Sequence, residues 1–87
     1  MSYLLEVCAD SVRSAVEAQA GGADRIELCS GLVIGGLSPS VAMFEQVKKN
    51  VDIPVRVLLR PRFGDFCYDG YELETLKEEV CLFREAG

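Results

Sequence analysis

Two short motifs in this chain carry the same pair of chemical groups. One apolar run closes on Glu-Val-Cys at Glu6 to Cys8, and a second closes on Glu-Leu-Cys at Glu27 to Cys29. Thiolates are soft ligands that select Cu(I) over harder cations, whereas carboxylates can serve as general acids or bases. If the two runs are neighbouring parallel strands, both motifs reach the edge of the sheet where α/β barrels build their sites. Cys8 and Cys29 are therefore candidate metal ligands.

The cysteines also have a purely structural interpretation, because free cysteine usually behaves as a small buried apolar side chain. The four cysteines are widely spaced and form no C-x-x-C pair, so we expect free thiols. Neighbouring parallel strands lie about 4.8 Å apart, which would bring matching strand ends close together. Inward residues of one barrel layer come from alternate strands, however, which allows Cys8 and Cys29 to sit at different heights. With no histidine in the chain, any metal would be held by sulfur or carboxylate.

Two carboxylates and a guanidinium form a second candidate site, made of Glu6, Glu27 and Arg60. Facing one cavity, they could bind a small polar metabolite, with one carboxylate acting as general acid or base. The alternative is an internal ion-pair network in which these charges only satisfy one another. Arg62 and Asp65 in the following loop could extend either arrangement. The sequence leaves both possibilities open.

Charge and hydropathy exclude several classes of protein. The 87 residues are 49% hydrophobic and 26% charged, with a net charge of −5, which is typical of a globular domain. Because no basic stripe is present, a nucleic-acid or anionic membrane partner is not expected. The N-terminal residues show neither a signal peptide nor a membrane span. We expect a cytoplasmic protein.

The first half of the chain predicts two strand–helix units. A strand is expected from Tyr3 to Cys8, and Asp10 stands at the expected N-cap of a helix with apolar residues at helical spacing. Gly21 and Gly22 predict the end of that helix. A second strand is expected from Arg25 to Cys29. Ser38 and Pro39 then predict the start of the second helix.

The second half predicts one further unit. Val55 to Arg60 is the most strand-like run of the chain, Pro61 to Gly70 is expected to form a loop, and a last amphipathic helix is expected to run to Ala86. The glycine-rich loop between Ser30 and Gly36 lacks the spacing of a phosphate-binding loop. Its glycines are therefore predicted to serve backbone conformation rather than anion binding.

Three strand–helix units in strict alternation predict an α/β fold with a parallel sheet. A doubly wound sheet would bury both faces and favour continuous apolar strands. Here polar residues alternate with apolar neighbours, which favours a TIM-like barrel. The alternation places Glu6, Cys8, Glu27, Cys29 and Arg60 on the inner side, and their apolar neighbours on the side of the helices.

Four stretches of the chain together resemble the copper homeostasis protein CutC family: Leu5 to Ser11, Gly21 to Leu32, Gly35 to Ser40 and Arg60 to Phe66. The resemblance implies a TIM-like barrel in the cytoplasm that takes part in copper handling. It further implies that Cys8 and Cys29 match the Cu(I) ligands of animal members of the family.

A barrel of eight units normally needs about 250 residues, and this chain supplies three units. We therefore expect residues 1–87 to form a partial barrel domain, truncated at its C-terminus. Such a piece would leave strand edges and apolar surface uncovered, which favours association. The full-length form is expected to be a homo-oligomer. A truncated chain without independent activity is thus a third possibility, beside the copper protein and the enzyme.

Overall fold

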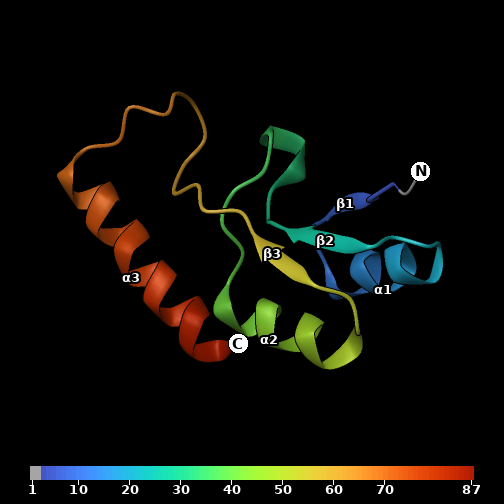
Figure 1. Ribbon diagram of the computed structural model, residues 1–87. Helices are drawn as coiled ribbons and strands as arrows, with labels where there is room; N and C mark the ends of the chain where they lie inside the picture. The colour runs from blue at the N-terminus through green and yellow to red at the C-terminus, as the bar shows by residue number, and fades with distance from the viewer. Residues whose placement is uncertain (1–2) are drawn as a thin grey trace.

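The computed structural model describes residues 3–87, in which each strand is followed by at least one helix before the next strand begins. The elements, in order, are β1 (Glu6–Ala9), α1 (Val12–Ala20), β2 (Arg25–Leu28), the 3-10 helix η1 (Leu32–Ile34), α2 (Val41–Asn50), β3 (Val55–Val57) and α3 (Gly70–Ala86). The strands pair in parallel in the order β1-β2-β3, and α1 and α2 lie on the same side of the sheet (Figure 1). Sequential parallel strands with their helices on one side form consecutive units of a TIM-like barrel. The predicted fold class is confirmed.

The first unit begins later than predicted. β1 covers Glu6–Ala9, not Tyr3 to Cys8, because the Leu5 N–H donates to the Asp24 carboxylate at 2.7 Å. The N-cap of α1 is Ser11 rather than Asp10, since the Ser11 hydroxyl accepts a hydrogen bond from the Ser14 N–H at 3.0 Å. Polar residues at adjacent positions can both serve as N-caps, and the helix geometry selects one of them.

The second helix and the third strand also differ from the predicted boundaries, for a single reason. The Ser38 N–H donates to the Arg60 carbonyl at 3.0 Å, and the Arg60 N–H donates to the Ser38 hydroxyl at 2.6 Å. Because Ser38 is engaged in this pairing, Ser40 caps α2 and accepts from the Met43 N–H. β3 ends at Val57, so Arg60 pairs with a loop and lies outside the sheet.

The last helix is confirmed to Ala86. Asp69 and Glu72 form a reciprocal capping box at its start, which satisfies two backbone N–H groups there. Near its end, the Phe83 ring meets the Phe44 ring edge to face, with centroids 5.4 Å apart. This contact holds α3 against α2.

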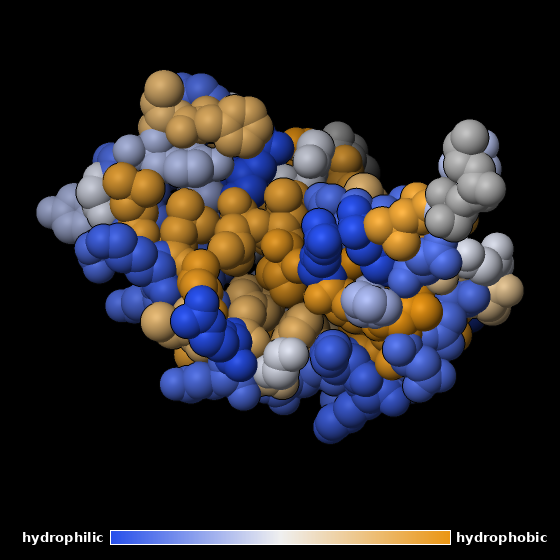
Figure 2. Space-filling model, viewed as in Figure 1, coloured by the Kyte–Doolittle hydropathy of each residue, from blue (hydrophilic) through white to orange (hydrophobic). Residues whose placement is uncertain are grey.

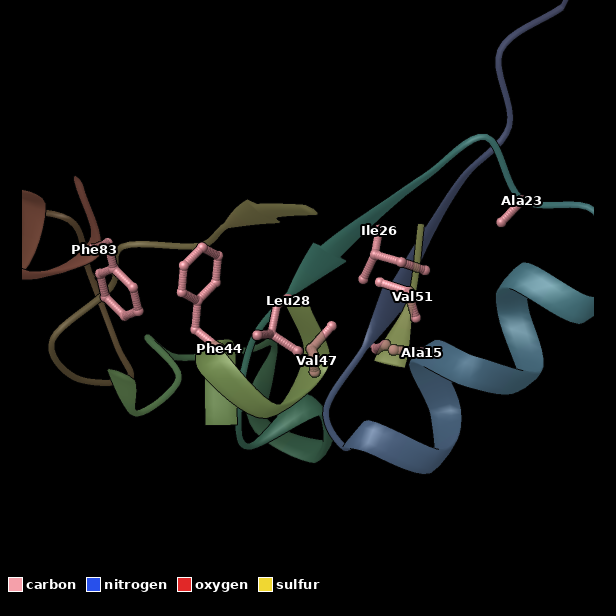
Figure 3. Close-up of a cluster of buried hydrophobic side chains, with 9 residues drawn as sticks. Ala15, Ala23, Ile26, Leu28, Phe44, Val47, Val51 and Phe83 are labelled. Carbon is pink, nitrogen blue, oxygen red and sulfur yellow. The ribbon is translucent and has the colours of Figure 1, made fainter. Parts of the chain in front are cut away.

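The hydrophobic core lies between the sheet and the helices (Figure 3). Ile26 and Leu28 of β2 are fully buried, and their register partners Val7, Val55 and Val57 pack against the core. Side chains alternate between the two faces of a strand. The side chains of Glu6, Cys8 and Glu27 therefore lie on the face opposite the helices, as predicted.

Apolar surface remains exposed outside this core. Figure 2 shows hydrophobic residues gathered in a band across the face that carries α3 and β3. Leu73 and Leu82 of α3 are 49% and 50% exposed, and Leu4 and Leu5 ahead of β1 are exposed as well. Between residues 3 and 87, no helix is both long and apolar enough to cross a membrane.

Candidate metal centre

The strand register offsets the two candidate thiols. Cys8 lies opposite Glu27, and Ala9 lies opposite Leu28, so Cys29 is one position beyond the last registered pair. The ladder still continues there, because the Cys29 N–H donates to the Ala9 carbonyl at 3.0 Å. Cys8 and Cys29 therefore share the face opposite the helices, at neighbouring strand ends, but two residues apart along the strand direction.

The two thiols differ sharply in exposure. Cys8 is exposed, whereas Cys29 is only 1% exposed and its Sγ lies 3.6 Å from the Ala9 carbonyl oxygen. The glycine-rich loop closes over Cys29 at Gly36, whose φ is +92°. A Cβ at Gly36 would lie 3.0 Å from Leu58 and 3.8 Å from the Cys29 Sγ. Here glycine serves backbone conformation and close packing, as predicted for this loop.

The pKa values of both thiols are raised above the ordinary value of a cysteine. Burial raises the pKa of the Cys29 thiol, and the nearby Cys8, Asp10 and Glu27 raise that pKa further. For Cys8, loss of hydration is again the largest cause of a raised pKa, followed by the carboxylates of Glu27 and Glu6.

The two carboxylates of the second candidate site have different surroundings. Glu6 forms an ion pair with its register neighbour Arg25 at 3.1 Å, an interaction that was not predicted from the sequence. Glu27 lies between Cys8 and Arg56 in the register. Arg25 and Glu27 lie two positions apart in β2, and this spacing in the sequence already places both side chains on one face of the strand.

Arg60 is held by the loops instead. Its guanidinium donates to the carbonyls of Gly36, at 3.3 Å, and Gly64, at 2.9 Å, and lies 5.0 Å from the Phe66 ring centroid. Within the described residues, no hydrogen bond or ion pair joins any two of Glu6, Glu27 and Arg60. The structure does not assemble these three groups into a cluster, and a catalytic role for them stays a prediction.

Arg62 organises the loop between β3 and α3. Its guanidinium binds the carboxylates of Asp65 and Glu72 and the Cys67 carbonyl, and lies 5.4 Å from the Tyr68 ring centroid. The Arg62 side chain lowers the pKa of the Asp65 carboxyl, with a smaller contribution from the Cys67 N–H. Arg62 and Asp65 therefore hold this loop together and do not extend the Glu6 and Glu27 face.

The donor set limits the metals that the site could hold. Within residues 3–87, no group of three or more His, Cys, Asp or Glu side chains is arranged to bind a metal. Structural zinc sites need four protein ligands, and catalytic ones need three. Thiol side chains at neighbouring strand ends are soft donors, which select soft cations over hard ones.

Parallel βα units with a polar, thiol-bearing face opposite the helices define an α/β protein of the TIM-like barrel class. The model of the CutC family matches residues 3–87. The chain belongs to the CutC family.

Individual relatives agree with this membership. The human copper homeostasis protein cutC homolog is 54% identical over 85 residues, covering 98% of this chain and 31% of the human protein. A CutC family protein of Erwinia tasmaniensis is 47% identical over 83 residues, covering 95% of this chain and 33% of that protein. The chain thus spans about a third of the length of these relatives.

The fold has a close structural counterpart. The crystal structure of CutC from Streptococcus agalactiae superposes with a TM-score of 0.90 at 30% identity, covering 98% of this chain and 42% of that one. The arrangement of strands and helices described above is therefore the arrangement found in a solved member of the family.

Proposed function

We propose that this chain takes part in copper handling by binding Cu(I) between the thiolates of Cys8 and Cys29. The observation that carries the proposal is that both thiols project from one face of the sheet, at the neighbouring C-terminal ends of β1 and β2. Two relatives, one human and one mouse, are named as copper homeostasis proteins, which supports copper as the ion. Soft sulfur donors favour Cu(I) over harder cations.

The two cysteines would contribute in different ways. The exposed Cys8 is accessible to an ion arriving from solvent, and the buried Cys29 supplies a second sulfur from beneath the glycine-rich loop. Both thiols must lose their protons to become ligands. The carboxylate of Glu27, level with Cys8, carries a negative charge beside both thiols and would attract the cation.

A competition titration tests the proposal. Reduced protein is titrated with Cu(I) against a chelator of known affinity, as wild type, Cys8→Ser and Cys29→Ser. Loss of a group that merely supports a metal ligand costs about 10–100-fold in affinity, so loss of a ligand should cost at least as much. We expect each variant to bind Cu(I) at least about tenfold more weakly than wild type.

The control carries Cys67→Ser together with Cys81→Ser, which removes the two other thiols, both exposed. This variant should match wild type in stoichiometry and affinity. Equal affinity in wild type, Cys8→Ser and Cys29→Ser would remove the proposal.

We also propose a cytoplasmic location. All four cysteines are free thiols, and Cys8, Cys67 and Cys81 are exposed. Exposed thiols persist in a reducing compartment. Fractionation of cells that express a tagged full-length protein tests this, and recovery with the membrane or secreted fraction would contradict it.

A further inference from the structure

The offset between Cys8 and Cys29 has a consequence for their redox chemistry. Parallel strands rise about 3.3 Å per residue and lie about 4.8 Å apart. Two positions on neighbouring strands that are offset by two residues, which we call the diagonal, therefore have Cα atoms roughly 8 Å apart. The register and the Cys29 to Ala9 hydrogen bond fix this diagonal.

A disulfide cannot span that separation. Disulfide-bonded cysteines have Cα atoms about 4.4–6.8 Å apart, and pairs beyond about 7 Å need backbone movement to be joined. β2 is the central strand of the sheet and is paired with β1 and β3 on its two sides. At the end of β2, the Leu58 N–H also donates to the Leu28 carbonyl at 2.9 Å. Sliding β2 to bring Cys29 level with Cys8 would break both ladders and move the buried Ile26 and Leu28 out of register.

A bridging metal ion would require less backbone movement than a disulfide. Two metal–thiolate bonds of about 2.3 Å each allow sulfur atoms up to roughly 4.6 Å apart, more than twice the length of the S–S bond. The Cys29 Sγ already leans toward β1, where it meets the Ala9 carbonyl at 3.6 Å. Side-chain rotation alone can therefore supply the bridging geometry.

We propose that the register makes Cys8 and Cys29 a pair that one soft metal ion can bridge but that cannot close into a disulfide. The metal half of this inference rests on the proposed function, whereas the disulfide half rests on the register alone. In the presence of glutathione disulfide, Cys8 exchanges with it as the exposed thiol. One glutathione is bonded to Cys8, and the other leaves as the thiolate that takes up the proton. Cys29 cannot then displace the glutathione from Cys8.

Peptide mapping under non-reducing conditions tests the inference. Intact protein carrying Cys67→Ser and Cys81→Ser is treated with glutathione disulfide at pH 8.5, alkylated, digested and analysed by mass spectrometry. We expect glutathione on Cys8, an alkylated Cys29, and no peptide pair that joins the two cysteines. A substantial yield of peptides joined through Cys8 and Cys29 would overturn the inference.

A matched variant provides the positive control. Glu27→Cys together with Cys29→Ser places the second thiol directly opposite Cys8, where the Cα separation of about 4.8 Å lies within the disulfide range. We expect this variant to form a disulfide between Cys8 and the thiol introduced at position 27 under the same conditions. If it shows no cooperative thermal unfolding, Glu27→Cys is combined with Cys29→Ala instead of Cys29→Ser.

The two proposals fail separately. If the protein neither binds Cu(I) nor forms the cross-link, the proposed function is rejected, while the inference that Cys8 and Cys29 cannot form a disulfide stands. A cross-link in protein that still binds Cu(I) would reject only the inference.

Discussion

Cys8 lies directly opposite Glu27, and not opposite Cys29. The repeated Glu-x-Cys motifs are therefore displaced by two residues when the strands pair, so each motif contributes its thiol at a different height. As a result, a carboxylate and not a second thiol is the immediate neighbour of Cys8 across the strands. This placement explains why Glu27 raises the pKa of the Cys8 thiol.

Copper affinity should depend steeply on pH. The pKa values of both Cys8 and Cys29 are raised above their ordinary value, so binding as thiolates must displace a proton from each thiol. Each displaced proton changes the apparent affinity about tenfold per pH unit, so affinity should rise by about a hundredfold per unit as pH increases. Cu(I) competition at several pH values measures the slope.

The slope also reports the number of thiol ligands. In Cys8→Ser, one proton fewer is displaced, and the dependence should fall to about tenfold per pH unit. An affinity that does not change between pH 6 and pH 8 in wild type would contradict thiolate ligation.

Gln19 should be important for stability, although it lies far from the thiols along the chain. Its side-chain oxygen accepts the N–H groups of Asp52, at 2.6 Å, and Ile53, at 3.3 Å, and so joins the end of α1 to the turn before β3. Gln19→Ala leaves two donors without this acceptor and should lower the free energy of unfolding by about 1–2 kcal/mol. Urea denaturation measures the change.

Gln46 provides the matched control, because it is an exposed glutamine in α2 whose side chain makes no hydrogen bond within the described part of the chain. Gln46→Ala should stay within about 0.5 kcal/mol of wild type. Equal effects of the two substitutions would mean that the Gln19 contact does not stabilise the fold.

Phe83 should anchor the last helix. The ring is 8% exposed and packs edge to face on Phe44 (Figure 3). Phe83→Ala should cost about 3–5 kcal/mol, since it removes buried area and leaves a cavity. The neighbouring Leu82 is 50% exposed, and Leu82→Ala should cost less than about 0.5 kcal/mol. Thermal unfolding followed by circular dichroism compares the two, and a larger loss in Leu82→Ala would show that α3 docks through another face.

Arg62 should order the loop between β3 and α3. A lysine keeps the charge but cannot donate in a fork to Asp65, Glu72 and the Cys67 carbonyl together. Arg62→Lys should therefore speed amide hydrogen exchange in residues 61–69 while leaving exchange in β2 unchanged. The exposed Arg13 of α1 serves as control, and faster loop exchange in Arg13→Lys would argue against a local effect of Arg62.

The sequence by itself determined the types of the elements, their order and the face on which each strand side chain lies. These are local properties: capping residues and apolar spacing define each helix, and alternation with period two defines each strand face. Glu6, Cys8 and Glu27 were therefore assigned to the correct face before any tertiary contact was considered, and the last helix was predicted to its final turn.

Only the tertiary structure decided the register of β1 against β2, and with it the height of each thiol. A shift of two residues leaves every side chain on the same face, so the alternation in the sequence cannot detect it. The loops that receive Arg60 and Arg62 are likewise placed by contacts between distant segments. Arg60 was predicted to belong to a strand because its partners, Gly36 and Ser38, come near it only when the sheet and helices have packed.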